Sequence, residues 1–216
     1  MVFPIYFFFI AVSFLASLAV FFRRKSAVYL RLFPLFLALT ILVEIVAFRL
    51  VNRKGGTNTA LYNFFGVVEF LFYLFVLHEV IHNKRAKRVI FCVSLAYLAW
   101  VSINFIFIQK INTFHTMDYA IGCLLIAAVC IYYFYELFQL SHSVNLVRQP
   151  AFWICSGLLF FYTCSFPLYG FLNFIKFAPT VIIRNLATIL NILNVLLYSS
   201  FTIAFLCMIR IRKSTS

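Results

Sequence analysis

Long apolar runs alternate with short polar connections along the whole chain. One of them reads FFFIAVSFLASLAVFF, which is apolar on every side of a helix and lacks the alternation of a barrel strand. Only helices and closed barrels satisfy their own backbone hydrogen bonds in lipid, so these runs are predicted to be helices. Seven runs reach the roughly 20 residues that cross a bilayer, at about 3–22, 31–51, 60–82, 89–109, 116–138, 151–174 and 186–209.

Composition indicates the same class of protein. Of the 216 residues, 65% are hydrophobic and only 11% are charged, and the mean hydropathy is +1.05. A water-soluble protein of this size cannot hide that much apolar surface. We therefore predict an all-α, polytopic membrane protein in which residues 1–216 form one seven-helix bundle. The connections between the predicted helices are too short for a kinase, cyclase or nucleotide-hydrolysing domain.

The formal net charge is +13, but its distribution does not suggest nucleic-acid binding. Lys and Arg lie in short clusters between the apolar runs, which is typical of topology signals, and we predict no nucleic-acid partner. With the N-terminus outside, twelve of the 18 Lys and Arg residues face the cytoplasm and six face outward. This excess predicts an N-out, C-in orientation.

A few polar residues fall inside the predicted helices, and these are the main candidates for function. Glu44 and Glu69 lie in the second and third helices, and Asn191 and Asn194 share one face of the seventh. At the helical rise of about 1.5 Å per residue, all four fall in the outer half of the bundle. Two serines are predicted in the same layer, Ser102 and Ser165.

These six residues predict a pocket for a small ligand, a proton or a cation. An ionisable group in hydrocarbon costs several kcal/mol unless it is paired or hydrated, which favours a functional role for the two glutamates. Asparagine and serine often form hydrogen bonds between transmembrane helices, and we favour that role for them. The sequence leaves open whether Glu44 and Glu69 face one cavity.

The stretch HEVIH (78–82) matches the H-E-x-x-H pattern of zinc peptidases. On a helix, His78 and His82 would share one face beside Glu79 as a general base, and Glu136 or His142 could supply a third ligand. The motif lies directly before the basic string NKRAKR, which would repel a cation. We therefore favour a polar helix end in the headgroup zone, and predict no metal and no cofactor.

A further group of polar residues is expected at the outer mouth of the bundle. We interpret these as solvated rim residues: Arg49, His115, Asp118, Lys176 and Arg184.

Three stretches resemble a family of uncharacterised bacterial seven-helix membrane proteins: LYNFFGVVEFLFY, PAFWICSGLLFFY and NILNVLLYSSFTIAF. The resemblance covers most of the chain, and HEVIH is not part of it. It rests on a spaced pattern of Asn63, Glu69, Phe152, Trp153, Gly157, Tyr162, Asn191 and Asn194. Such proteins are often encoded beside histidine kinases that lack membrane spans of their own. The resemblance implies a place in the bacterial cytoplasmic membrane and a sensory or anchoring role beside such a kinase.

The residues suggest the same role independently. A bundle without a soluble domain can signal only by passing a conformational change to another chain, and NKRAKR offers a surface for a partner or for anionic lipid. Two alternatives stay open. One is a membrane-embedded, metal-dependent hydrolase that uses HEVIH, and the other is a small proton-coupled transporter that uses the two glutamates.

Overall fold

The computed structural model describes residues 4–21, 26–52, 57–108, 113–139, 145–170 and 180–211, apart from a few side chains near the ends of the last helix. Every regular element in these ranges is helical, which confirms the predicted all-α fold. The helices are α1 (Ile5–Phe21), α2 (Val28–Val51), α3 (Thr59–Val80), α4 (Lys84–Ile103), α5 (Thr116–Gln139), α6 (Pro150–Gly170) and α7 (Thr180–Ile211). A π-helical turn, η1 (Asn104–Ile108), extends α4, and a 3-10 turn, η2 (Leu146–Arg148), precedes α6.

The lengths and composition of these helices fit a membrane protein. Six of them, α2 to α7, are long and apolar enough to cross a bilayer. The first helix, α1, has 17 residues, and so measures about 26 Å at the usual helical rise. That is slightly less than the hydrocarbon thickness of about 30 Å.

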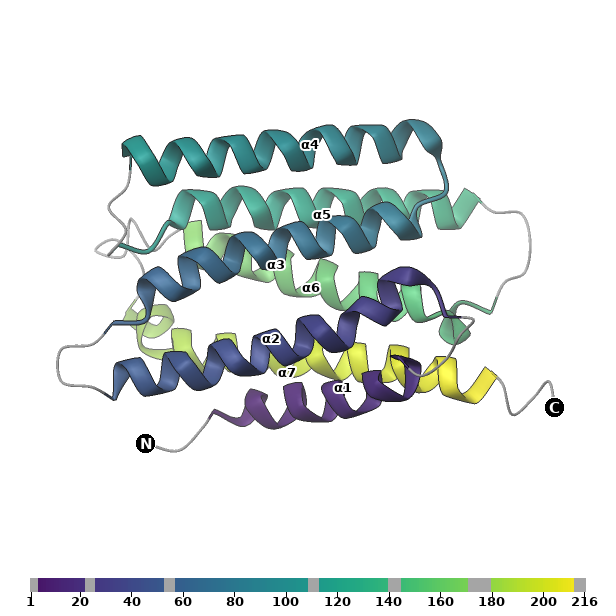
Figure 1. Cartoon of the computed structure of the whole chain (residues 1–216), viewed down its shortest axis with the longest axis horizontal. Coiled ribbons are helices and arrows are strands. Elements are labelled where there is room, and N and C mark those ends of the chain that lie inside the picture. Colours follow the sequence, from purple (N-terminus) through teal and green to yellow (C-terminus); the bar gives the residue numbers. More distant parts are fainter. Residues whose placement is uncertain are drawn as a thin grey trace.

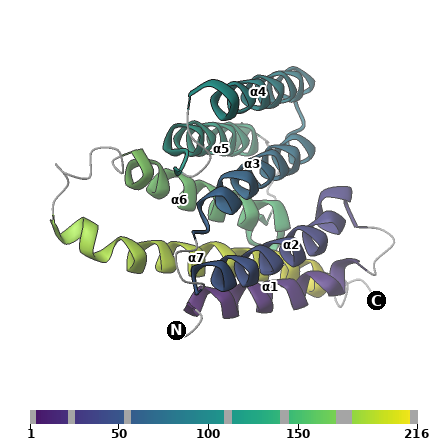
Figure 2. The same ribbon diagram turned by 60° about the vertical axis from the view of Figure 1, so that its left-hand side comes forward.

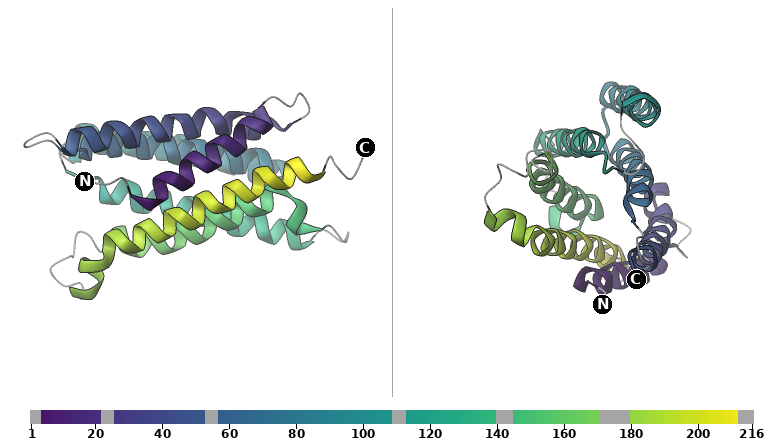
Figure 3. Two further views of the ribbon diagram at one scale, coloured as in Figure 1. Left: turned by 90° about the horizontal axis from the view of Figure 1, so that it is seen from below. Right: turned by 90° about the vertical axis from the view of Figure 1, so that its left-hand side faces the viewer.

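The helices lie along the long axis of the bundle (Figure 1). Seen end-on, α1, α2, α3, α5, α6 and α7 surround a common centre, and α4 lies outside this ring (Figure 3). The outer helix packs on α3 and α5, at the far side of the bundle from α1 and α7 (Figure 2). Large apolar side chains on α4 and η1 are exposed, including Phe91 of α4 at 59% and Phe107 of η1 at 79%, as expected of a face that meets lipid.

The turn between α3 and α4 differs from the sequence prediction. The third helix ends at Val80, because Ile81 adopts an extended backbone. The fourth begins at Lys84, earlier than predicted, because the Asn83 side chain accepts hydrogen bonds from the backbone N–H groups of Arg85 (2.8 Å) and Ala86 (3.4 Å). This cap lets the basic residues form the first turn of α4, where hydropathy alone predicts a loop.

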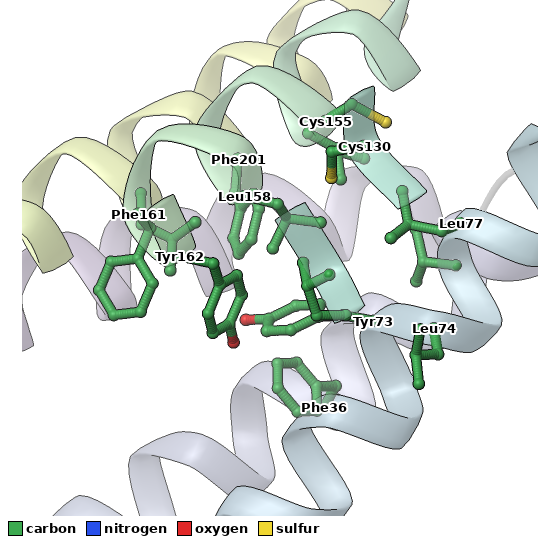
Figure 4. Packing of buried hydrophobic residues seen from close by; sticks show 14 of the residues in the cluster. Phe36, Tyr73, Leu74, Leu77, Cys130, Cys155, Leu158, Phe161, Tyr162 and Phe201 are labelled. Carbon is green, nitrogen blue, oxygen red and sulfur yellow. The ribbon is translucent and has the colours of Figure 1, made fainter. Parts of the chain in front are cut away.

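Aromatic rings fill the middle of the bundle (Figure 4). Phe36 of α2 stacks on Phe72 of α3 with ring centroids 4.1 Å apart, and Phe33 lies 5.3 Å from Phe201 of α7. Tyr73 of α3 is fully buried, and its hydroxyl points toward Tyr162 of α6 (Figure 4). These rings join four helices in one apolar layer.

Two glycines allow close helix contacts on either side of this layer. A Cβ at Gly157 of α6 would overlap the Ser200 side chain of α7. A Cβ at Gly122 of α5 would lie 2.6 Å from the Phe70 ring of α3. By contrast, a Cβ at Gly66 would meet its nearest neighbour at an ordinary 3.9 Å. The α6–α7 contact therefore depends on the absence of a side chain at Gly157.

We expect Gly157→Ala to destabilise the protein by about 1–3 kcal/mol, because the added methyl group forces α6 and α7 apart. Gly66→Ala is the matched control and should change stability far less. Thermal unfolding of the purified variants in detergent measures both effects. Equal melting temperatures for the two variants would show that α6 and α7 are not closely packed at this point.

Candidate functional site

A cavity of about 550 Å³ lies inside the ring of helices. Four of the six site residues proposed from the sequence line it, namely Glu44, Glu69, Asn191 and Asn194. The two glutamates therefore do face one cavity, a point that the sequence leaves open. The remaining lining residues are Pro4, Tyr6, Thr40, Asn58, Tyr62, Phe65, Gly66, Phe114, Tyr119, Phe161, Tyr169, Ala187, Leu190 and Tyr198.

The cavity occupies the half of the bundle that contains the start of α1 and the end of α2. It extends from Pro4 and Asn58 to Thr40, Glu69 and Tyr198. One helical turn further along α2, α3 and α7, the next side chains on the same faces are the buried rings of Phe36, Tyr73 and Phe201. These rings form an aromatic floor that separates the cavity from the opposite half.

Glu44 links three helices through its carboxylate. The Tyr6 hydroxyl of α1 donates to Glu44 Oε2 at 2.7 Å, and the Tyr62 hydroxyl of α3 donates to the same oxygen at 3.2 Å. Hydrogen bonds to an ionised carboxylate are typically short and strong, and the 2.7 Å bond from Tyr6 has the expected length. They orient the carboxylate at the wall of the cavity and tie α1 to α2 and α3.

Glu69 lies deeper and has one hydroxyl donor. The Tyr162 hydroxyl of α6 donates to Glu69 Oε1 at 3.2 Å. None of the described lining residues is Lys, Arg or His, so neither glutamate has a cationic partner among them. The described wall is therefore acidic, and the described side chains that bind its two carboxyl groups are tyrosines.

Among the described residues, neither asparagine makes the interhelical hydrogen bond that we favour from the sequence. The Asn194 amide donates to the Leu190 carbonyl of its own helix at 2.9 Å. Asn191 lies one turn earlier on the cavity wall. Both residues contribute polar surface to the cavity.

The two predicted serines are not among the residues that line the cavity with the other four. Ser102 is exposed on α4, and its hydroxyl donates to the Leu98 carbonyl at 2.8 Å. Ser165 is fully buried in α6, and its hydroxyl has no hydrogen-bond partner among the described residues. Depth along a helix fixes the layer of a residue, but the direction that it faces depends on the neighbouring helices.

The tyrosines of the cavity are missing from the sequence prediction. Five of them line the cavity: Tyr6, Tyr62, Tyr119, Tyr169 and Tyr198. One signal was present in the sequence. Tyr62, Gly66, Glu69 and Tyr73 recur along α3 at the spacing of a single helical face.

The HEVIH stretch does not form the helical pair that a zinc site requires. The third helix ends at Val80, so His78 and His82 do not share a helical face, and that prediction is wrong. Glu136 accepts the backbone N–H groups of His82 (3.0 Å) and Asn83 (2.8 Å), which caps the turn between α3 and α4. His142 lies outside the described residues. The structure contains no group of three possible metal ligands within those residues.

A second, smaller cavity of about 380 Å³ lies at this opposite end of the bundle. Its wall contains Glu79, His82 and Glu136, but not His78, whose Nδ1 lies 3.3 Å from Glu79 Oε1. The end of α3 lies between the two histidines of the motif, and only His82 lines this cavity.

Two of the predicted rim residues are buried, which corrects their interpretation as solvated groups. His115 is 3% exposed and Asp118 is 4% exposed. His115 Nδ1 lies 3.2 Å from Asp118 Oδ2, and the Trp100 indole of α4 donates to Asp118 Oδ1 at 3.0 Å. Arg49 is exposed, as predicted. Lys176 and the side chain of Arg184 lie outside the described parts of the chain.

Asn63 explains how this buried cluster is held. Its side-chain amide donates to the Thr113 carbonyl at 2.8 Å, and its side-chain oxygen accepts the His115 backbone N–H at 3.0 Å. One residue of α3 therefore fixes the segment that leads into α5. Because Phe114 of that segment lines the main cavity, Asn63 also supports the cavity wall.

We expect Asn63→Ala to destabilise the protein by about 1–3 kcal/mol, because it removes the side-chain acceptor of the buried His115 N–H group and the donor to the Thr113 carbonyl. Asn145→Ala is the control, since Asn145 is exposed and its side chain makes no capping hydrogen bond. Thermal unfolding in detergent checks the difference. A loss no greater than that of Asn145→Ala would contradict the structural role of Asn63.

No known protein-family model, curated protein or solved structure matches this chain. The class of protein therefore follows from the fold and the site. The chain is an all-helical bundle of the membrane type, with an acidic, tyrosine-lined cavity in one half. That these residues bind a ligand stays a prediction.

Proposed function

We propose that the protein is a membrane receptor module that binds a small ligand in the 550 Å³ cavity and signals through a partner protein. The observation that carries the proposal is the convergence of Glu44, Glu69, Asn191 and Asn194 on one cavity above an aromatic floor. A site closed toward the other side suits a receptor. Two carboxylates in one cavity also suit a proton-coupled transporter. Such a transporter needs a continuous path through the bundle, which the aromatic floor interrupts.

The proposal includes the place and orientation of the protein. It lies in a bacterial cytoplasmic membrane, crosses it seven times, and has its N-terminus outside. The cavity half then faces outward. The exposed basic residues at the start of α4, Lys84, Arg85 and Arg88, face the cytoplasm, where anionic lipid and a partner would meet them.

Two helices can carry a change from the cavity to the inner end. Tyr198 lines the cavity, and α7 continues past Phe201 to Ile211. Glu69 lines the cavity, and α3 continues past Tyr73 to the turn that Glu136 caps. Closely packed rings do not deform continuously, so a ligand that displaces Glu69 or Tyr198 must repack the aromatic floor. The partner that fits this arrangement, and the family resemblance, is a cytoplasmic histidine kinase.

The orientation predicts opposite accessibility for two single cysteines. Thr57→Cys, beside the start of α3, should react with a membrane-impermeant maleimide on intact cells. Asn145→Cys, beside η2, should react only after the cells are permeabilised. The wild-type chain reports any labelling of its six native cysteines. Labelling of both variants on intact cells would contradict the proposed topology.

The receptor function predicts that a chemical group attached inside the cavity changes the activity of the partner kinase. Ala187 and Thr188 of α7 are both exposed, but only Ala187 is among the residues that line the cavity. We expect a histidine kinase to co-purify with the intact chain, and its autophosphorylation to change at least threefold when Ala187→Cys is modified with a maleimide. Thr188→Cys, modified in the same way, is the matched control.

Two results would contradict the receptor function. One is that no signalling protein is recovered with the intact chain. The other is that modification at the two neighbouring positions has equal effects on the kinase.

A further inference from the structure

The wall of the main cavity combines acidic and aromatic groups. Of its described residues, two are glutamates, and none is Lys, Arg or His. Eight are aromatic, five tyrosines and three phenylalanines. The polar groups that complete it, such as Asn191 and Asn194, are neutral.

This composition disfavours three classes of ligand. An anion would be repelled by Glu44 and Glu69, and no described cation is present to attract it. A bare metal ion needs several oxygen, nitrogen or sulfur ligands in a small space. The described residues offer no group of three His, Cys, Asp or Glu side chains that could hold one, and the cavity of about 550 Å³ is far larger than an ion. A neutral ligand would leave the carboxylates without a charged partner in a low-dielectric surrounding.

We infer that the cavity binds an organic ammonium ion, an amine or a quaternary ammonium compound with apolar substituents. This inference rests on the proposed function and names the class of ligand for the same site. The carboxylates of Glu44 and Glu69 supply the opposite charge. The aromatic rings around them supply the negative ring faces that attract ammonium groups and the apolar surface that their substituents need. The cavity volume of about 550 Å³ lies in the range of pockets that bind small organic molecules.

The tyrosines have a second role in this site. Tyr6 and Tyr62 donate their hydroxyls to Glu44, and Tyr162 donates to Glu69. These bonds hold the carboxylates in place before the ligand arrives, so the ordering cost of binding is reduced. Of these three donors, Tyr6 and Tyr62 line the cavity, so their rings are also part of its aromatic wall.

The test uses the intact chain in lipid nanodiscs and isothermal titration calorimetry. The probes are choline, tetraethylammonium, phenethylammonium and spermidine. The neutral compound 3,3-dimethylbutan-1-ol has the shape of choline without its charge, and glucose represents neutral polyols. We expect at least one ammonium compound to bind, and choline to bind at least tenfold more tightly than its neutral counterpart.

Variants then locate the site. Glu44→Gln and Glu69→Gln should each weaken binding of the best ammonium probe at least tenfold. Glu79→Gln, at the opposite end of the bundle, should leave binding unchanged. Tyr62→Phe should retain more affinity than Tyr62→Leu, because only the phenylalanine keeps an aromatic face. Melting temperatures confirm that each variant is folded.

The outcomes distinguish a failure of the ammonium inference from a failure of the proposed receptor function. If choline and its neutral counterpart bind equally, or if only glucose binds, the cavity takes a ligand but the ammonium inference is overturned. If none of the four ammonium probes binds, the inference is also overturned. The receptor function is then decided by the kinase response to modification at Ala187, which needs no knowledge of the ligand.

Discussion

The lack of hydrogen-bond partners in hydrocarbon is the constraint on which this structure depends. It requires helices, because every backbone N–H and C=O group must be satisfied within the chain. It also favours internal partners for the ionisable side chains that lie between the helices. Glu44 and Glu69 meet this requirement with tyrosine hydroxyls from α1, α3 and α6. No described residue of the cavity wall places a positive charge beside the two glutamates, and the inferred ammonium ligand would supply that charge.

The third helix connects the functional parts of the molecule. Near its start, Asn63 fixes the segment before α5, and Glu69 then lines the cavity. Tyr73 follows in the aromatic floor, and the helix ends at the turn that Glu136 caps. Along this one rigid helix, Glu69 is therefore close both to the segment that Asn63 fixes and to the turn that Glu136 caps. This arrangement would allow the proposed receptor to act without a soluble domain among the described residues.

A sequence predicts those features of a structure that depend on neighbouring residues in the chain. Helix number and approximate bounds follow from the thickness of the bilayer, and Glu44 and Glu69 stand out because carboxylates are rare at that depth. The direction in which a side chain faces is not local. Ser102 was misplaced because α4 lies outside the ring, which only the packing of α3 and α5 decides (Figure 3). His115 was misplaced for a similar reason, since its burial depends on Asn63, 52 residues away.

The same constraint gives HEVIH an ordinary role at the inner end. When α3 ends at Val80, the backbone N–H groups that follow it lose their helical partners. Glu136 of α5 accepts two of them, from His82 and Asn83, and Asn83 in turn caps the start of α4. The carboxylate that a zinc site would have needed as a third ligand is thus part of a helix–turn–helix connection. Glu136 and Asn83 secure the turn beside the basic surface, whereas Glu44 and Glu69 at the other end line the larger of these two cavities. The proposed function therefore expects ligand binding in the half that contains Glu44 and Glu69, and partner binding at the end that contains the α3–α4 turn.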